Sequence, residues 1–270
     1  MAFLIHGVGY AVFMSVGWLL IRVPADGWKP AGWEPTPQPA GSLISGGNVS
    51  ARNAIKTPQF WLLWVVLCFN VTAGIGILER AAPIYSDFFP GGAGLAAAAA
   101  GFVAILSLAN MLGRVVWSSS SDLIGRKNAY RMYLGVGALL YLAVMLTTNA
   151  NKVVFLVCCM LILSFYGAGF ATVPAYLRDL FGTYQVGAIH GRLLTAWSTA
   201  GVLGPVIVNA IADARIAAGV TGPGRYTLSF SIMIGLLIIG FVCNELIRPV
   251  NPRFHQPASE QAAGKAAMAA

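Results

Sequence analysis

The chain is poor in charge, because only 10% of its 270 residues are Asp, Glu, Lys or Arg. An average soluble domain carries roughly 25% charged residues. Hydrophobic residues make up 57% of the sequence. So little polar surface excludes an ordinary soluble domain and indicates an all-α protein that crosses a membrane several times.

The sequence also lacks the motifs by which common enzymes are recognised. It has no His-x-x-Glu-His zinc motif, no Gly-x-Ser-x-Gly elbow and no phosphate-binding loop. The cysteines lie inside apolar stretches without metal-ligand spacing: Cys68, Cys158, Cys159 and Cys243. We therefore expect no enzyme, no metal and no cofactor. The net charge of +8 has its cause in the loops, so we expect no nucleic-acid partner either.

What the sequence does contain is a series of long apolar runs. A membrane-spanning helix needs about 20 such residues, and backbone groups in lipid must be paired within the segment. The first run has no basic region before it and no cleavage site, so we interpret it as a span and not as a signal peptide. Seven runs are predicted to span the membrane: Phe3–Ile21, Phe60–Leu78, Ala96–Trp117, Met132–Thr148, Val153–Pro174, Leu193–Ala212 and Thr227–Ile247.

The loops between these runs predict the orientation. Basic residues prefer the cytoplasmic side of a membrane. The other side holds only Arg80, Lys152, Arg215 and Arg225. We therefore expect a multi-pass protein of the plasma (inner) membrane with its N-terminus outside and its C-terminus in the cytoplasm. The predicted cytoplasmic side holds Arg22, Lys29, Arg52, Lys56, Arg126, Lys127, Arg131, Arg178, Arg192, Arg248, Arg253 and Lys265.

A proline-rich stretch divides the chain. Residues 23–58 contain six prolines with Gly and Ser between them, a composition that cannot bury enough apolar surface to fold alone. We predict a transmembrane helix at 1–22, a cytoplasmic linker at 23–58, a six-helix unit at 59–248 and a cytoplasmic tail at 249–270. A single helix before six others is an odd arrangement unless something precedes it.

One span carries a polar stripe. Ser107, Asn110, Arg114 and Ser118 recur at helical spacing and should share one face. Arginine in hydrocarbon is costly and is by default a candidate functional residue. No span has an interior Asp or Glu, so a substrate carboxylate is a candidate partner for Arg114, held through two parallel hydrogen bonds. The alternative is an arginine that reaches the membrane interface for solvation.

Two further spans hold candidates for the same site. Tyr166 and Phe170 are four residues apart and should share a face, either lining a small-anion cavity or packing as ordinary aromatic residues. In the next span Ser198 lies beside Trp197 in a polar patch. The candidate substrate-binding residues are therefore Ser107, Asn110, Arg114, Tyr166, Trp197 and Ser198.

The segment Ser118-x3-Asp122-x2-Gly125-Arg126-Lys127 resembles the signature loop of the major facilitator superfamily, with Ser118 in place of the usual first glycine. The run Gly201-Val202-Leu203-Gly204-Pro205 resembles the Gly-Pro motif of the same superfamily. Other runs resemble the oxalate/formate antiporter family: 23–30, 70–76, 175–182 and 191–197.

This resemblance implies that the seven spans are helices 6 to 12 of a twelve-helix carrier whose N-terminal half is missing. It implies transport of a small organic anion, such as formate, oxalate or a monocarboxylate, by alternating access, with membrane lipid as the surroundings. The arginine at the position of Arg114 would contribute to substrate binding, and the loop residues Asp122, Gly125, Arg126 and Lys127 would control gating.

The resemblance also implies a second cation, a lysine near Trp197, for exchange of oxalate. This chain has none there, which favours a monocarboxylate. Asp122 is expected to pair with Arg178 or with a helix N-terminus. The alternative reading of seven helices with an external N-terminus is a receptor or sensor.

Overall fold

The computed structural model describes all residues except 23–27, 29–30, 33–42, 93, 147–150 and 258–270. The described residues form helices and turns, with an isolated bridge between Val49 and His255 and no strand among them. The chain divides into two units, Met1–Pro39 and Ala40–Ala270. The prediction of an all-α polytopic membrane protein is confirmed.

The first unit contains one helix, α1 (Ala2–Leu20). Its side chains are apolar and exposed on every face, as Phe3, Phe13 and Trp18 illustrate with exposed fractions of 94%, 78% and 78%. A helix that is hydrophobic all round belongs in a protein core or in hydrocarbon. This matches the first predicted span.

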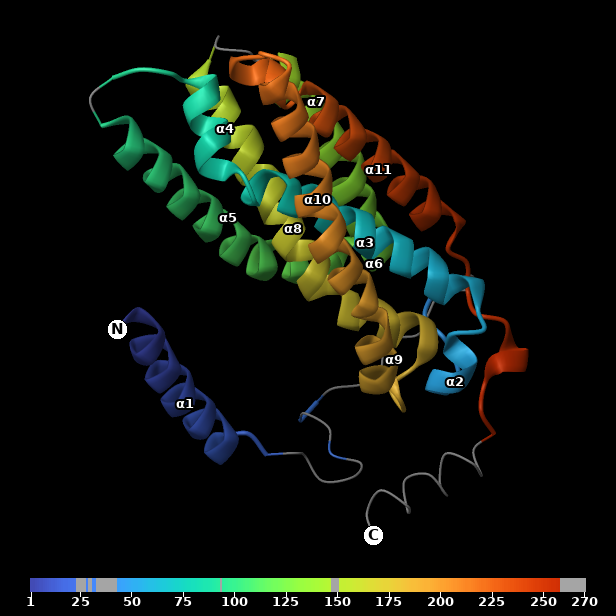
Figure 1. Cartoon of the computed structure of the whole chain (residues 1–270). Coiled ribbons are helices and arrows are strands. Elements are labelled where there is room, and N and C mark those ends of the chain that lie inside the picture. The colour runs from blue at the N-terminus through green and yellow to red at the C-terminus, as the bar shows by residue number, and fades with distance from the viewer. Residues whose placement is uncertain (23–27, 29–30, 33–42, 93, 147–150, 258–270) are drawn as a thin grey trace. The chain divides into compact units, whose positions relative to one another are not determined.

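The second unit is a bundle of long helices (Figure 1). In chain order it contains α2 (Ala51–Ala54), α3 (Pro58–Leu78), α4 (Ala81–Phe88), α5 (Leu95–Ile124), α6 (Arg126–Arg131), the π-helical turn η1 (Met132–Val136), α7 (Gly137–Leu146), α8 (Lys152–Phe181), α9 (Val186–Leu193), α10 (Thr195–Ala217), the 3-10 turn η2 (Gly222–Arg225), α11 (Thr227–Leu246) and the 3-10 turn η3 (Pro252–Phe254).

Seven helical segments of the described residues are long and apolar enough to cross a membrane, as predicted. Their ends differ from the predictions. The third span does not end at Trp117, because α5 continues to Ile124. The fifth passes through Pro174 and reaches Phe181. The residues at these ends are polar because they lie outside the hydrocarbon. The apolar pattern therefore stops before the helix does.

Two glycines end the longest helices. Gly125 follows α5 with φ +85°, and Gly182 follows α8 with φ +79°. An L-residue with a side chain is strained at such angles, whereas glycine adopts them freely. Gly125 therefore turns the chain directly from α5 into α6, which places the charged residues of this turn close together.

The pair α5 and α8 lies side by side and packs backbone to backbone (Figure 1). A Cβ added at Gly113 would overlap the backbone of Ser164, and one at Gly167 would overlap the backbone and side-chain oxygens of Asn110. Small residues permit this close approach between membrane helices. The indole N–H of Trp117 donates to Ser164 Oγ at 3.0 Å across the same contact.

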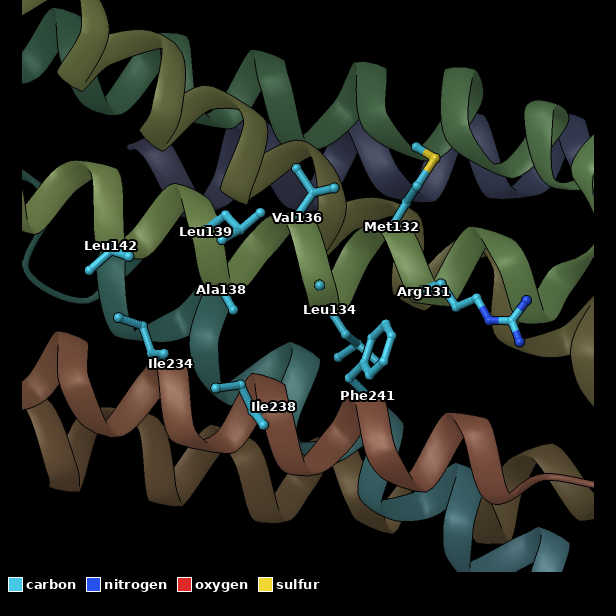
Figure 2. A pocket seen from close by; sticks show the side chains of 11 residues that line it. Arg131, Met132, Leu134, Val136, Ala138, Leu139, Leu142, Ile234, Ile238 and Phe241 are labelled. Atoms are coloured by element: carbon cyan, nitrogen blue, oxygen red, sulfur yellow. The ribbon is translucent and has the colours of Figure 1, made fainter.

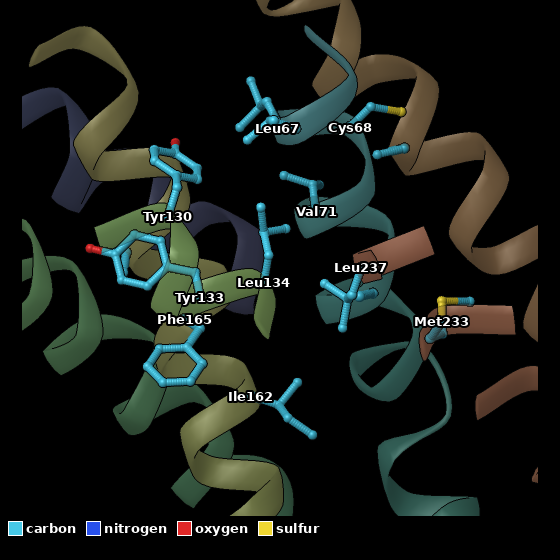
Figure 3. Packing of buried hydrophobic residues seen from close by; sticks show 14 of the residues in the cluster. Leu67, Cys68, Val71, Tyr130, Tyr133, Leu134, Ile162, Phe165, Met233 and Leu237 are labelled. Atoms are coloured by element: carbon cyan, nitrogen blue, oxygen red, sulfur yellow. The ribbon is translucent and has the colours of Figure 1, made fainter. Parts of the chain in front are cut away.

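The core lies between these helices and α3, η1 and α11. Figure 3 shows Tyr130 and Tyr133 beside Phe165 of α8, with Leu237 of α11 nearby. Buried tyrosine hydroxyls need acceptors, and Tyr130 donates to Gly169 O at 2.5 Å while Tyr133 donates to Trp117 O at 3.1 Å. These bonds tie the α6–η1 segment to both α5 and α8.

The predicted linker and tail lie partly outside the described residues. Of the linker, residues 43–57 are hydrogen-bonded to the bundle: Ser45 N–H donates to Asp179 O at 2.6 Å, and Val49 N–H donates to Phe181 O at 2.8 Å. From the tail, Gln256 N–H donates to Asn48 O at 2.8 Å. The described ends of both segments therefore close over the C-terminal end of α8.

Candidate functional site

Arg114 lies on an exposed face of α5. The polar stripe follows this face as predicted: Ser107 is exposed, Asn110 and Ser118 are partly buried, and Ser107 Oγ donates to Val103 O at 3.0 Å within its own helix. Asn110 faces α8, and its buried Oδ1 accepts no hydrogen bond from any described residue. Arg114 is therefore the charged member of the stripe, and Asn110 is its link to α8.

The guanidinium of Arg114 contacts an aromatic ring and no carboxylate among the described residues. Its Cζ lies 5.5 Å from the centre of the Phe170 ring on α8. The Phe170 ring lies 5.4 Å from that of Trp197 on α10, at 60° in an edge-to-face arrangement. A cation over a ring is held by the ring's negative face. Three helices thus meet in one cluster, which we call the arginine–aromatic cluster: Arg114, Phe170 and Trp197.

The structure separates the remaining candidates from this cluster. The ring of Tyr166 packs on Gly74 of α3, where a Cβ would overlap it. Ser198 is exposed next to Trp197. Ser107 lies two helical turns before Arg114, roughly 10 Å along α5. Among the described residues, no hydrogen bond or ring contact joins these three side chains to Arg114, Phe170 or Trp197.

Phe170 was not among the candidate substrate-binding residues, because an aromatic residue four positions after Tyr166 is equally consistent with ordinary packing. Gly113, the neighbour of Arg114, was not singled out at all. Its signal was its place in an otherwise bulky apolar run, since a glycine in a helix interior costs about 1 kcal/mol unless close packing requires it.

The ion pairs among the described residues lie near helix ends, away from Arg114. Arg80 pairs with Asp213 at 2.5 Å, and Arg225 pairs with Asp87 at 2.8 Å. The hydroxyl of Tyr226 also donates to Asp87 at 2.7 Å. Burial and the adjacent Asp87 carboxylate raise the pKa of Tyr226 well above its usual range. These contacts fix one end of the bundle, and Arg114, within α5, has no acidic partner among the described residues.

The opposite end contains the predicted gating loop. Arg126 donates to Asp122 and to Ser121, and its Nε lies 3.6 Å from Asp179 Oδ2. The expected pairing of Asp122 with Arg178 or a helix N-terminus was wrong. Because α5 stays helical to Ile124 and turns at Gly125, Asp122 and Arg126 come into reach at a spacing of four residues.

Lys127 binds other partners than the adjacent Arg126. Its Nζ donates to Glu245 O at 2.7 Å and to Ile247 O at 3.0 Å, at the C-terminus of α11. Arg131 binds the Glu245 carboxylate through two bonds of 2.5 and 2.6 Å. A cation at a helix C-terminus satisfies carbonyls that have no partner within the helix. The loop therefore links α5, α8 and α11.

No group of three or more His, Cys, Asp or Glu side chains able to hold a metal ion occurs in the part of the chain that the structure describes. The cavities there are small or open to the surface. Arg114 presents a guanidinium, a group that can hold a carboxylate through two parallel hydrogen bonds, next to the rings of Phe170 and Trp197.

Two comparisons with known proteins bear on the family of the chain. The sequence profile of the Major Facilitator Superfamily matches residues 1–205. The oxalate:formate antiporter of Oxalobacter formigenes is 27% identical over 175 residues. That alignment covers 63% of this chain but only 40% of the antiporter.

Proposed function

Because the chain belongs to the Major Facilitator Superfamily, a family of membrane transporters, we propose that it carries a small organic anion across the membrane by alternating access, with Arg114 as the group that binds the carboxylate. Membership makes the chain a transporter protein and not an enzyme. It leaves the alternative of a seven-helix receptor without support.

The observation that carries the proposal is the isolation of Arg114. It lies ten residues before the C-terminus of α5, its guanidinium lies over the Phe170 ring, and no ion pair joins it to a described carboxylate. A charge in this setting is costly unless it is paired or solvated. A carboxylate that accepts two parallel hydrogen bonds from the guanidinium would supply the pairing.

The surroundings of Arg114 favour a small anion with one carboxylate. Its described neighbours are the rings of Phe170 and Trp197, with no second cation in contact. A dicarboxylate such as oxalate would leave one charge without a partner. The antiporter from Oxalobacter formigenes, by its name, takes oxalate and formate, and we propose that this chain acts on formate or a related monocarboxylate. Exchange of one anion for another is the mode that this relative suggests.

We also propose that a second helical bundle completes the site. Arg114, Ser107, Trp197 and Ser198 all lie on exposed parts of α5 and α10, and hydrocarbon could not solvate the charged guanidinium among them. Facing helices would enclose them, as in carriers that place their site between two halves. The proposed orientation places the gating loop in the cytoplasm of a plasma-membrane carrier.

The test is uptake of labelled formate, lactate, pyruvate and oxalate into vesicles from cells that make the transporter. A charge-assisted hydrogen bond contributes about 1.5–3 kcal/mol, so Arg114→Lys should raise KM for the preferred anion by roughly 10- to 150-fold, because lysine lacks the planar fork. Arg114→Ala should abolish saturable uptake.

Arg192→Lys is the matched control, since Arg192 is an exposed arginine on α9 whose Nη1 donates only to Ala188 O in its own helix. Its uptake should equal that of the unmodified protein. Normal uptake by Arg114→Ala, at equal protein level in the membrane, would refute the site assignment. Transport of oxalate in preference to formate would refute the proposed substrate while leaving the role of Arg114 intact.

A further inference from the structure

A groove of about 590 Å³ lies between the η1–α7 segment and α11, on other helices than Arg114. In Figure 2, Ile234, Ile238 and Phe241 of α11 lie beside Leu134 and Ala138 of the η1–α7 segment. Apart from Arg131 at one end, its walls are apolar. They are formed by Leu134, Leu139, Leu142, Ile234, Ile238 and Phe241, among others.

The backbone shapes this groove. The π-helical turn η1 interrupts the regular helix beside it, and such turns are rare and often occur at functional sites. Within η1, Gly135 faces Phe241, where a Cβ would come within 3.3 Å of the ring. Because glycine has no side chain, the groove is deeper at this position. The outer rim stays accessible, since Leu139 and Ile238 are 65% and 52% exposed.

One end of the groove is cationic. Lys127 binds the carbonyl oxygens of Glu245 and Ile247, Arg131 binds the Glu245 carboxylate, and Arg248 follows directly after Ile247. Their donors are not exhausted. Lys127 uses two of its three N–H groups, on the carbonyls of Glu245 and Ile247. The side chain of Arg248 is exposed. Among the described residues, these three cations and the one carboxylate of Glu245 leave an excess of two positive charges at this end.

The length of the groove fits one leaflet of a bilayer. Eleven residues separate Arg131 from Leu142, which is roughly 16 Å along a helix. The hydrocarbon core of a bilayer is about 30 Å thick, so one leaflet is about 15 Å deep. Figure 2 shows Arg131 at one end of the groove and Leu142 at the other. An occupant with an apolar tail as long as a leaflet and a negative head at its surface would match both features.

We propose that this groove binds an anionic phospholipid, with one acyl chain along the η1–α7 and α11 walls and the headgroup phosphate against Lys127, Arg131 and Arg248. The charge argues for this occupant over a second copy of the chain or another apolar helix, because neither would place a negative group at the cationic end. The inference uses the membrane setting of the chain and is independent of the anion that the carrier transports.

The test is photo-crosslinking of the 270-residue protein in phosphatidylcholine vesicles. These contain a small fraction of either phosphatidylglycerol or phosphatidylcholine with a photoreactive acyl chain. We expect the phosphatidylglycerol probe to label peptides from 131–142 and 234–241 several times more strongly than the phosphatidylcholine probe. Removal of one headgroup cation by Arg248→Gln should lower that labelling roughly fivefold. Arg253→Gln, an exposed arginine in η3 outside the groove, should leave it unchanged.

A second pair of variants tests the apolar part. Leu139→Trp fills the groove, whereas Leu146→Trp places the same bulk on an exposed position of α7 outside it. Labelling should fall in the first and persist in the second. Equal labelling by the two probes would overturn the anionic headgroup. Labelling that survives Leu139→Trp, or labelling that falls only on peptides outside 131–142 and 234–241, would overturn the lipid site.

Discussion

Gly113 offers a direct test of how α5 and α8 hold the arginine–aromatic cluster. Its α-carbon faces the Ser164 backbone, and a Cβ there would overlap the carbonyl oxygen, Cα and C of that residue. Backbone atoms cannot rotate away as a side chain can. Gly113→Ala should therefore push α5 away from α8 by on the order of 1 Å, the shortfall from ordinary van der Waals contact.

The expected cost follows from that displacement. Overpacking of a tight interior costs about 1–3 kcal/mol, partly offset by the roughly 1 kcal/mol that alanine gains over glycine in a helix. Stability should fall by no more than about 2 kcal/mol, so the protein should still fold. Because Arg114 is the next residue, its guanidinium moves relative to Phe170. The loss of one charge-assisted hydrogen bond to the substrate, about 1.5–3 kcal/mol, raises KM roughly 10- to 150-fold.

The assay is anion uptake, with KM and maximal rate measured separately, and Gly101→Ala as control. Gly101 lies in the same helix, but a Cβ there meets nothing within 4 Å. The Gly101→Ala variant should have an unchanged KM and a slightly raised melting temperature. An unaltered KM in Gly113→Ala, in protein that reaches the membrane in normal amount, would refute the view that this contact positions Arg114.

Two further predictions concern the ends of the bundle. Asp122→Asn removes the charge that Arg126 binds and should lower the maximal rate of uptake more than it raises KM, since this loop joins helices and does not reach Arg114; a raised KM at an unchanged maximal rate would contradict this. Tyr226→Phe tests the Asp87 contact through pH: the folded-state pKa of Tyr226 is raised, so its contribution to stability is complete below pH 10, the ordinary tyrosine value, and is lost as pH rises further. The phenylalanine variant should lose less stability than the parent between about pH 10 and 12 in thermal unfolding scans, and identical alkaline losses would count against it.

The membrane spans and the family were predictable because each rests on a local signal. Seven apolar runs identified the spans, and the Asp122–Lys127 turn carried the resemblance to the superfamily, which is confirmed by the profile match. The narrower resemblance to the oxalate/formate antiporter family agrees with the relative from Oxalobacter formigenes. The assignment of the spans to helices 6 to 12 stays a prediction.

Helix ends and contacts between helices were harder to predict. Apolar periodicity stops where a helix leaves the hydrocarbon, so Ser118–Ile124 read as a loop although it is helical. The partner of Asp122 depended on that continuation. Phe170 could be recognised as the partner of Arg114 only once α5 and α8 were side by side, because residues 56 positions apart leave no periodic signal in one sequence.

The choice of partner for Arg114 bears on how the proposed site would work. A carboxylate from the protein would hold the guanidinium firmly but would occupy the N–H donors that a substrate carboxylate needs. An aromatic ring attracts the cation by about 0.5–2 kcal/mol through its face and accepts none of those donors in the plane of the fork. Phe170 can therefore orient Arg114 while leaving its charge and its fork available. Phe170 also contacts Trp197. A shift of α10 relative to α8 would therefore change the position of the ring that lies beside Arg114. That contact gives the proposed carrier a physical link between helix movement and affinity for its anion.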